Sequence, residues 1–166
     1  MGLQSLNTLP MDQANHLFMQ CCTSERWIEE MVANRPFADI HSLRETADRI
    51  WNHLTEKDYL QAFEGHPKIG DVGSLKAKYA NTKELASDEQ SGANCATDEI
   101  IAELADSNSA YEEKYGFIFI VCATGKSAKE MLALLQDRLK NDRQKELEIA
   151  NEEQRKIFHL RLEKLL

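Results

Sequence analysis

A histidine stands at what the sequence predicts to be a rigid corner of the chain. The segment EGHPKIGD (Glu64–Asp71) follows a helical pattern that we expect to stop at Gly65. Glycine releases the backbone at such a stop, and Pro67 prevents the helix from resuming and restricts His66 to an extended conformation. An imidazole changes charge near neutral pH, which suits general acid–base chemistry, and loops often carry functional side chains. Alternatively, the histidine only stabilises the helix C-terminus, where the dipole favours a cation. This segment alone leaves the acid–base role and the structural role open.

An acidic residue and a neighbouring amide form a second candidate. In ASDEQSGA (Ala86–Ala93), Glu89 and Gln90 fall in the first turn of a predicted helix. Acidic side chains commonly occupy that turn because they interact favourably with the helix dipole. Taken alone, this segment therefore favours a structural role.

A strand-like run and an isolated arginine complete the candidates. FIFIVCATGK (Phe117–Lys126) has no evident partner strand, so we expect buried extended chain or a short transition, with most side chains packed in the core. Its backbone N–H and C=O groups still need partners, which a polar heterocycle can supply. Arg161 falls on an otherwise apolar face of the last predicted helix. Because burying an unpaired guanidinium is costly, we expect Arg161 to be paired or to face a cavity.

The sequence lacks the motifs that are typical of nucleotide-binding proteins, serine hydrolases and metal sites. The chain has no P-loop, no dinucleotide-binding glycine motif and no G-x-S-x-G elbow. A metal site around Glu64, His66 and Asp71 is not expected, because H-x-x-x-H and H-x-H spacings are absent.

Composition and charge restrict the class of protein. The 166 residues are 42% hydrophobic and 29% charged, which is ordinary for a soluble globular chain of one domain. A net charge of −8 argues against non-specific binding to nucleic acids or anionic membranes. No apolar run approaches the roughly 20 residues of a membrane span, and the N-terminus lacks a signal-peptide pattern. Without a C-x-x-C pair, the cysteines indicate a reduced, cytoplasmic protein. They are Cys21, Cys22, Cys95 and Cys122.

Helical periodicity runs through most of the chain, since prolines occur only at positions 10, 36 and 67. The expected helices cover residues 11–22, 24–33, 42–54, 55–64, 87–115, 127–139 and 142–166. Expected capping pairs are Ser42 with Glu45, Thr55 with Asp58, Ser87 with Gln90 and Ser127 with Glu130. The remaining histidines, His16, His41, His53 and His159, lie in or beside helical patterns and carry no special signal. The pattern predicts an all-α, single-domain helical bundle over residues 1–166.

Several motifs in a fixed order resemble one known family. GHPKIGD, EQSGA, YEEKYGFIFIVCATGKS and a final helix ending HLRLEKL follow one another along the chain. Their combined order is specific and resembles OHCU (2-oxo-4-hydroxy-4-carboxy-5-ureidoimidazoline) decarboxylase, the last enzyme of the uricase route from urate to S-allantoin. The resemblance covers nearly the whole chain. It implies an all-α enzyme of purine catabolism that acts on a small molecule, needs no cofactor or metal, and is usually a homodimer.

The resemblance also implies roles for individual residues. The family's catalytic histidine falls on His66, and its glutamate falls on Glu89, which would set the tautomer of the imidazole and favour its protonated form. The implied substrate contacts are Pro67, Ser87, Gln90, Phe119, Ile120, Val121, Cys122, Ala123 and Arg161. Which of His66 and Glu89 first acts as a base on the substrate hydroxyl stays open.

The chain departs from the family pattern in two places. In place of S-x-x-E-Q it has Ala86 three residues before Glu89, with the serine shifted to Ser87. The C-terminal EKLL is not the S-K-L-type peroxisomal address of many eukaryotic members, which favours a bacterial cytoplasmic enzyme.

Two other functions are alternatives to the decarboxylase. The first is a non-catalytic helical interaction module, in which His66, Glu89 and Arg161 need not converge. The second is a metal-dependent hydrolase, which chelators would inactivate.

Overall fold

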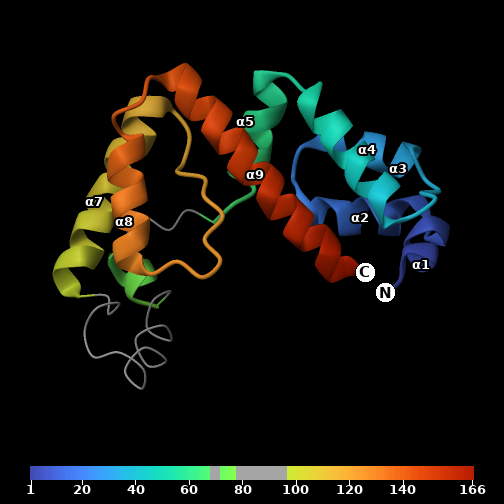
Figure 1. The fold of residues 1–166 in the computed structure, drawn as a ribbon, viewed down its shortest axis with the longest axis horizontal. Coiled ribbons are helices and arrows are strands. Elements are labelled where there is room, and N and C mark those ends of the chain that lie inside the picture. Colours follow the sequence, from blue (N-terminus) through green and yellow to red (C-terminus); the bar gives the residue numbers. More distant parts are fainter. Residues whose placement is uncertain (68–71, 78–96) are drawn as a thin grey trace. The chain divides into compact units, whose positions relative to one another are not determined.

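The computed structural model describes residues 1–67, 72–77 and 97–166, and within these ranges the chain forms helices and no strand (Figure 1). The helices are α1 (Leu3–Thr8), α2 (Met11–Cys21), α3 (Glu25–Ala33), α4 (Ile40–Asn52), α5 (Glu56–Glu64), α7 (Asp98–Tyr115), α8 (Ala128–Arg138) and α9 (Arg143–Leu165). A short helix also covers residues 72–77. The predicted all-α class is confirmed for the part of the chain that is described. The predicted capping pair of Ser87 with Gln90 lies outside it.

The chain divides into two compact units. Unit 1 comprises Met1–His66 and Asn151–Leu166, and unit 2 comprises Pro67–Ala150. Helix α9 begins in unit 2 and ends in unit 1. The single domain over residues 1–166 stays a prediction.

Unit 1 is built around a cluster of aromatic side chains. Trp27 of α3 is fully buried, and its ring centroid lies 5.1 Å from that of Phe158 on α9 and 6.1 Å from that of Phe18 on α2. Phe158 also meets the ring of Trp51 on α4, with 5.6 Å between the centroids. Such ring pairs contribute about 0.5–1.5 kcal/mol each beyond the apolar area that they bury. The cluster therefore holds the unit 1 part of α9 against α3 and α4, and α3 against α2.

Three predicted helix starts are confirmed by their hydrogen bonds. The hydroxyls of Ser24 and Ser127 each accept a hydrogen bond from the backbone N–H three residues further on, at 3.4 and 3.2 Å. At the start of α5, the Asp58 carboxylate accepts hydrogen bonds from the backbone N–H and the hydroxyl of Thr55, at 3.0 and 2.9 Å. Since a cap contributes typically ~1 kcal/mol, these local patterns fix where α3, α5 and α8 begin.

The predicted start at Ser42 is wrong. Helix α4 begins at Ile40, and Asp39 is its N-cap, because the Asp39 carboxylate accepts the backbone N–H of Ser42 at 2.7 Å. The Ser42 side chain in turn accepts the N–H of Asp39 at 3.1 Å. Aspartate caps helices as well as serine does. The pair of Asp39 and Ser42, which lies earlier in the chain than the predicted pair, therefore satisfies the free N–H groups at the start of the helix.

Unit 2 contains α7 and α8, which pack side by side (Figure 1). Tyr111 and Tyr115 of α7 and Leu135 of α8 are almost completely buried. Gly116 ends α7 with a φ of 81°, a left-handed conformation that glycine adopts without steric cost. The chain then continues as a non-helical segment in which Phe117 and Ile120 are buried, in line with the predicted buried transition.

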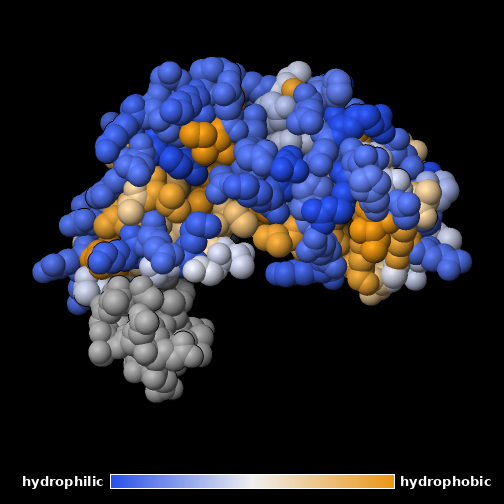
Figure 2. Space-filling model, viewed as in Figure 1, coloured by the Kyte–Doolittle hydropathy of each residue, from blue (hydrophilic) through white to orange (hydrophobic). Residues whose placement is uncertain are grey.

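The face in Figure 2 is mostly hydrophilic, with hydrophobic atoms in separate patches. The exposed large hydrophobic side chains of the described ranges are Met1, Met11, Met19, Ile40, Val72 and Leu160. None of the described helices is both long enough and apolar enough to cross a membrane.

Candidate active site

His66 directly follows the C-terminus of α5. The helix ends at Glu64, Gly65 is its C-cap, and the backbone N–H of His66 donates to the carbonyl of Phe63 at 3.1 Å. The predicted end of this helix is therefore confirmed. His66 is half-buried, whereas Pro67 is exposed.

Gly65 is needed at this corner because another side chain packs directly onto it. Its φ of −71° is open to any residue, so the expectation that it releases the backbone is wrong. A Cβ on Gly65 would lie 2.1 Å from the hydroxyl oxygen of Thr23 and 2.4 Å from its methyl carbon. Thr23 is held there because its hydroxyl donates to the carbonyls of Gln61 and Ala62, at 3.1 and 3.2 Å, near the end of α5.

We expect Gly65→Ala to lower the free energy of unfolding and to displace His66. The new methyl group must push Thr23 away from the end of α5 and break its hydrogen bonds, and such overpacking costs typically ~1–3 kcal/mol. Denaturant unfolding measures the loss. Gly2→Ala is the matched control, since a Cβ there meets nothing within 4 Å. A Gly65→Ala midpoint equal to that of the wild type would contradict the close packing.

The imidazole of His66 is held by a residue from α9. Its Nε2 lies 2.5 Å from the Oε1 of Gln154, whose side chain is fully buried. An amide oxygen can only accept, so Nε2 carries the hydrogen of this bond. The Nε2 of Gln154 is buried and meets no hydrogen-bond partner among the residues that the structure describes.

Arg161 lies about two turns of α9 beyond Gln154. Its Nη1 donates to the backbone carbonyls of Cys21 at 3.3 Å and Gln20 at 3.5 Å, at the C-terminus of α2, where the helix dipole favours a cation. The expectation that Arg161 is paired is therefore confirmed. The residue is half-buried, so the guanidinium keeps part of its surface exposed.

Burial lowers the pKa of His66 below its ordinary value of 6.5, because removal from water disfavours the cationic ring. The hydrogen bond to Gln154 raises the pKa, and the positive charge of Arg161 lowers it again. The net effect is a ring that is neutral at neutral pH. An anion placed beside it would favour its protonation.

Two neighbouring thiols are unsuited to nucleophilic chemistry. Burial raises the pKa of both Cys21 and Cys22 to about 12, and the opposing effect of Arg161 is smaller. Since the thiolate is the reactive form, these cysteines are inert near neutral pH. His66 therefore remains the candidate for acid–base chemistry in this part of unit 1.

In unit 2, a buried ion pair supports the segment Phe119–Ala123. The guanidinium of Arg138 on α8 donates to the carbonyl of Ile120 at 2.6 Å and lies 4.5 Å from the centroid of the Phe119 ring. It also pairs with the carboxylate of Glu146 on α9, which is completely buried. The backbone of this segment is therefore fixed by charged side chains rather than by a neighbouring strand.

Further hydrogen bonds complete the surroundings of the Arg138–Glu146 pair. The Tyr111 hydroxyl donates to one oxygen of Glu146 at 2.6 Å, and the Asn141 amide donates to the other at 3.1 Å. Burial raises the pKa of the Tyr111 hydroxyl, which keeps it a neutral donor. Buried charges are tolerated when they are paired and hydrogen-bonded in this way.

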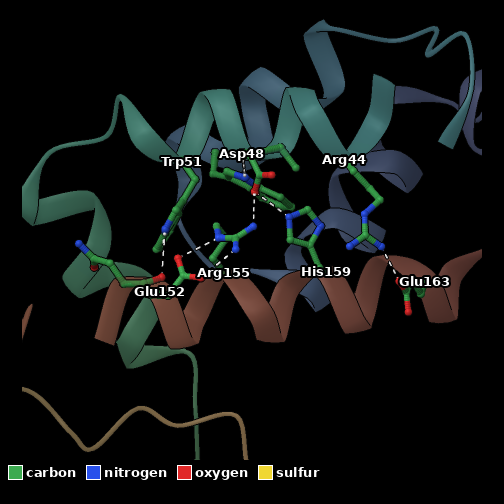
Figure 3. Close-up of polar contacts among 10 residues, drawn as sticks. Arg44, Asp48, Trp51, Glu152, Arg155, His159 and Glu163 are labelled. Atoms are coloured by element: carbon green, nitrogen blue, oxygen red, sulfur yellow. Dashed lines mark hydrogen bonds and ion pairs between the residues drawn. The ribbon is translucent and has the colours of Figure 1, made fainter. Parts of the chain in front are cut away.

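A second charged network joins α9 to α4 in unit 1 (Figure 3). The Asp48 carboxylate accepts hydrogen bonds from the Nε2 of His159 at 2.7 Å and the Nη1 of Arg155 at 3.2 Å. One turn earlier on α9, the backbone carbonyl of Asn151 accepts the indole N–H of Trp51 at 3.2 Å. His159, which carried no signal in the sequence, is thus buried and fixes the rotation of α9.

Sequence reasoning missed the polar side chains that are buried on α9. Glu146 and Gln154 lie four residues before and after the buried Ala150, so both interrupt its apolar stripe. The helical periodicity of the sequence could have revealed these two residues, because a polar residue on a buried stripe requires a hydrogen-bond partner. The partners themselves, Arg138 and His66, come from other elements.

His66 and Arg161 both belong to unit 1, where the charge of Arg161 lowers the pKa of His66, while the segment Phe119–Ala123 belongs to unit 2. The predicted site residues Ser87, Glu89 and Gln90 lie outside the described residues. Within the described ranges, no group of three or more His, Cys, Asp or Glu side chains is placed to hold a metal ion.

Comparison with known proteins identifies the family. The sequence profile of the OHCU decarboxylases matches residues 7–163. A uric acid degradation bifunctional protein of Arabidopsis thaliana is 34% identical over 145 residues, which are 87% of this chain and 45% of that protein. The 2-oxo-4-hydroxy-4-carboxy-5-ureidoimidazoline decarboxylase of Amia calva is 28% identical over 134 residues, which are 81% of this chain and 76% of that protein.

A solved structure agrees with these relatives. A crystal structure of OHCU decarboxylase in the presence of (S)-allantoin is 35% identical, covers 89% of this chain and 95% of its own, and superposes with a TM-score of 0.71. The chain therefore belongs to the OHCU decarboxylase family. It spans less than half of the length of the Arabidopsis protein.

Proposed function

We propose that this chain decarboxylates OHCU to S-allantoin in urate degradation, without a cofactor. The observation that carries the proposal is the setting of His66, the residue to which the resemblance assigns the role of catalytic histidine. Its imidazole is held by Gln154 and lies within the electrostatic influence of Arg161. The 35% identical OHCU decarboxylase, whose structure was determined in the presence of (S)-allantoin, supports the same reaction, of which S-allantoin is the product.

The substrate supplies its own electron sink. Its carboxylate is attached to a carbon that bears a hydroxyl group and adjoins a C=N bond. When CO2 leaves, the electron pair of the broken C–C bond delocalises into that C=N. The protein then has to orient the substrate and deliver a proton to one face, which makes the allantoin a single enantiomer.

The lowered pKa of His66 fits an anionic substrate. In the free protein the ring is neutral at neutral pH, because the effect of burial on its pKa outweighs that of the hydrogen bond that it donates to Gln154. The carboxylate of OHCU raises the imidazole pKa when it binds nearby, so the acid is formed where it is used. Protonation of His66 is thereby coupled to substrate binding.

Other residues are proposed to bind the substrate or assist His66, as the resemblance implies. Glu89 is proposed to favour the protonated imidazole, and Arg161 to hold a carbonyl or carboxylate. Further proposed contacts are Pro67, Ser87, Gln90 and the segment Phe119–Ala123, the last through its backbone. In support of the last contact, the Ile120 carbonyl is already held by Arg138.

Arg161→Ala is expected to weaken the binding of OHCU and of S-allantoin by about 1.5–3 kcal/mol, the usual contribution of a hydrogen bond to a charged group. Arg161→Lys should also weaken binding, since an ammonium group cannot reproduce the planar two-pronged contact. KM for OHCU and calorimetric binding of S-allantoin measure the effect. Arg44→Ala is the control, because its ion pair with Glu163 is on the surface. Unchanged affinity in both Arg161 variants would contradict the contact.

Circular dichroism of S-allantoin tests the reaction directly. The protein is mixed with freshly generated OHCU, and the optical signal of S-allantoin is followed against the slower spontaneous reaction, which yields a racemate. A non-catalytic helical module would leave the product racemic. Loss of turnover after exhaustive chelation would contradict the cofactor-free mechanism.

The proposed assembly is a cytoplasmic homodimer in which residues 1–166 act as one domain. The support is the resemblance to a usually homodimeric family. Light scattering coupled to size-exclusion chromatography measures the mass in solution, and the mass of a single chain would contradict the dimer.

A further inference from the structure

Gln154 occupies an unusual position for an amide. It is fully buried on the stripe of α9 that otherwise carries Ala150 and Phe158, yet its oxygen is aimed at His66. Its place is set independently of His66, because Asp48 holds the neighbouring Arg155 and, about one turn further along α9, His159. The imidazole therefore meets an acceptor whose position the helix has already fixed.

We propose that Gln154 is the positioning residue of His66: it keeps Nε2 as a bound donor and leaves Nδ1 as the atom that transfers the proton. The second half of this proposal rests on the proposed decarboxylase function. The resemblance assigns the orientation of the imidazole to Glu89, so Gln154 is a further and separate partner.

The protonation states of the ring determine which atom reacts. Both nitrogens of an imidazolium are donors, so an acid held through Nε2 needs an acceptor there, and the Gln154 oxygen provides one. The hydrogen on Nδ1 is then the one available for transfer. As the new C–H bond forms at the substrate carbon, the N–H bond breaks and its electron pair stays on Nδ1. The product is the neutral ring with its hydrogen on Nε2, still bonded to Gln154.

The same hydrogen bond gives the inference an electrostatic signature. Gln154 raises the pKa of His66, in opposition to burial. Its removal should lower the pKa further, so that the protonated acid is lost at lower pH. A carboxylate at position 154 should act in the opposite direction, because it favours the imidazolium more strongly than an amide does.

Gln154→Met and Gln154→Glu are the decisive variants. Methionine keeps the volume and removes the acceptor, and because Gln154 Nε2 lacks a described partner, the change need not destabilise the fold. Glutamate keeps an acceptor in place. Gln144→Met is the control, since Gln144 is exposed on the same helix and contacts only Glu148 in the described hydrogen bonds.

Two measurements are made on each variant. Nitrogen NMR of labelled histidine, assigned with His66→Asn, gives the tautomer and titration of the His66 ring without any substrate. Steady-state kinetics give kcat and KM against pH. For Gln154→Met we expect loss of the pure Nε2–H tautomer, a lower His66 pKa, and kcat reduced by up to about 100-fold with little change in KM, since misplacing a reacting group by about 1 Å has that effect. Gln154→Glu should shift the alkaline limb to higher pH.

Each outcome decides one part of the proposal. A wild-type tautomer and pH profile in a folded Gln154→Met would overturn the positioning role. If the wild-type ring carries its hydrogen on Nδ1, the amide of Gln154 is rotated by about 180°, so that its nitrogen faces the ring. This result would overturn the assignment of Nδ1 as the atom that transfers the proton. If the wild type fails to convert OHCU, the proposed function fails, but the ring spectra still decide whether Gln154 orients His66.

Discussion

His66→Asn is expected to lower kcat by ~10²–10⁴-fold, the usual contribution of a general acid, while the helical content stays unchanged. Asparagine cannot deliver a proton, but it is polar and fits a half-buried site. Stopped-flow measurement of S-allantoin formation gives kcat, and circular dichroism in the far ultraviolet gives the helical content.

The control for this prediction is His41→Asn, an exposed histidine on α4 that pairs with Glu45. Wild-type turnover in a folded His66→Asn would contradict the acid role. A loss of helicity as severe as the loss of activity would instead support a histidine that only stabilises the end of α5. In the wild type, kcat/KM should fall as the pH rises through a His66 pKa below 6.5, because the protonated ring is the proposed acid.

Arg138→Met should lower the free energy of unfolding by about 3–5 kcal/mol. The substitution leaves the Glu146 carboxylate completely buried without its cation, and breaking a buried pair in this way has effects of that size. The double variant Arg138→Met/Glu146→Leu removes both charges and should recover much of the loss. Denaturant unfolding of the two variants measures the difference.

Lys140→Met is the control, since its ion pair with Asp137 is exposed on both sides. Equal stabilities for the single and double Arg138 variants would contradict the buried-charge explanation. If the segment Phe119–Ala123 binds the product through its backbone, as proposed, the double variant should still bind S-allantoin more weakly than the wild type, because the Ile120 carbonyl has lost the donor that holds it.

Local features of this protein were predictable because their causes are local. Ser24, Thr55 and Ser127 mark helix starts through contacts within three residues. Asp39 was missed because two overlapping capping patterns compete there, and the earlier one prevails. Periodicity was therefore sufficient for the fold class but not for each boundary.

The candidate site was predictable only in part. His66 was marked by its neighbouring glycine and proline, and Arg161 by its apolar surroundings. Gln154 was missed because its partner lies 88 residues away, and no local pattern encodes such a contact. Arg138 was missed for a related reason, since its partners Ile120 and Glu146 come from two different segments. The reason for Gly65 was also non-local, because Thr23 packs onto it from another part of the chain.

Helix α9 sets the spacing between two side chains of the proposed site. Gln154 and Arg161 stand seven residues apart, so they share one face at an axial separation of about 10 Å. One inserted residue between them would rotate Arg161 by about 100° relative to Gln154, so that the two side chains would no longer project from the same face. Substitutions on the outer face of this stretch should thus be tolerated during evolution, whereas changes in its length should not.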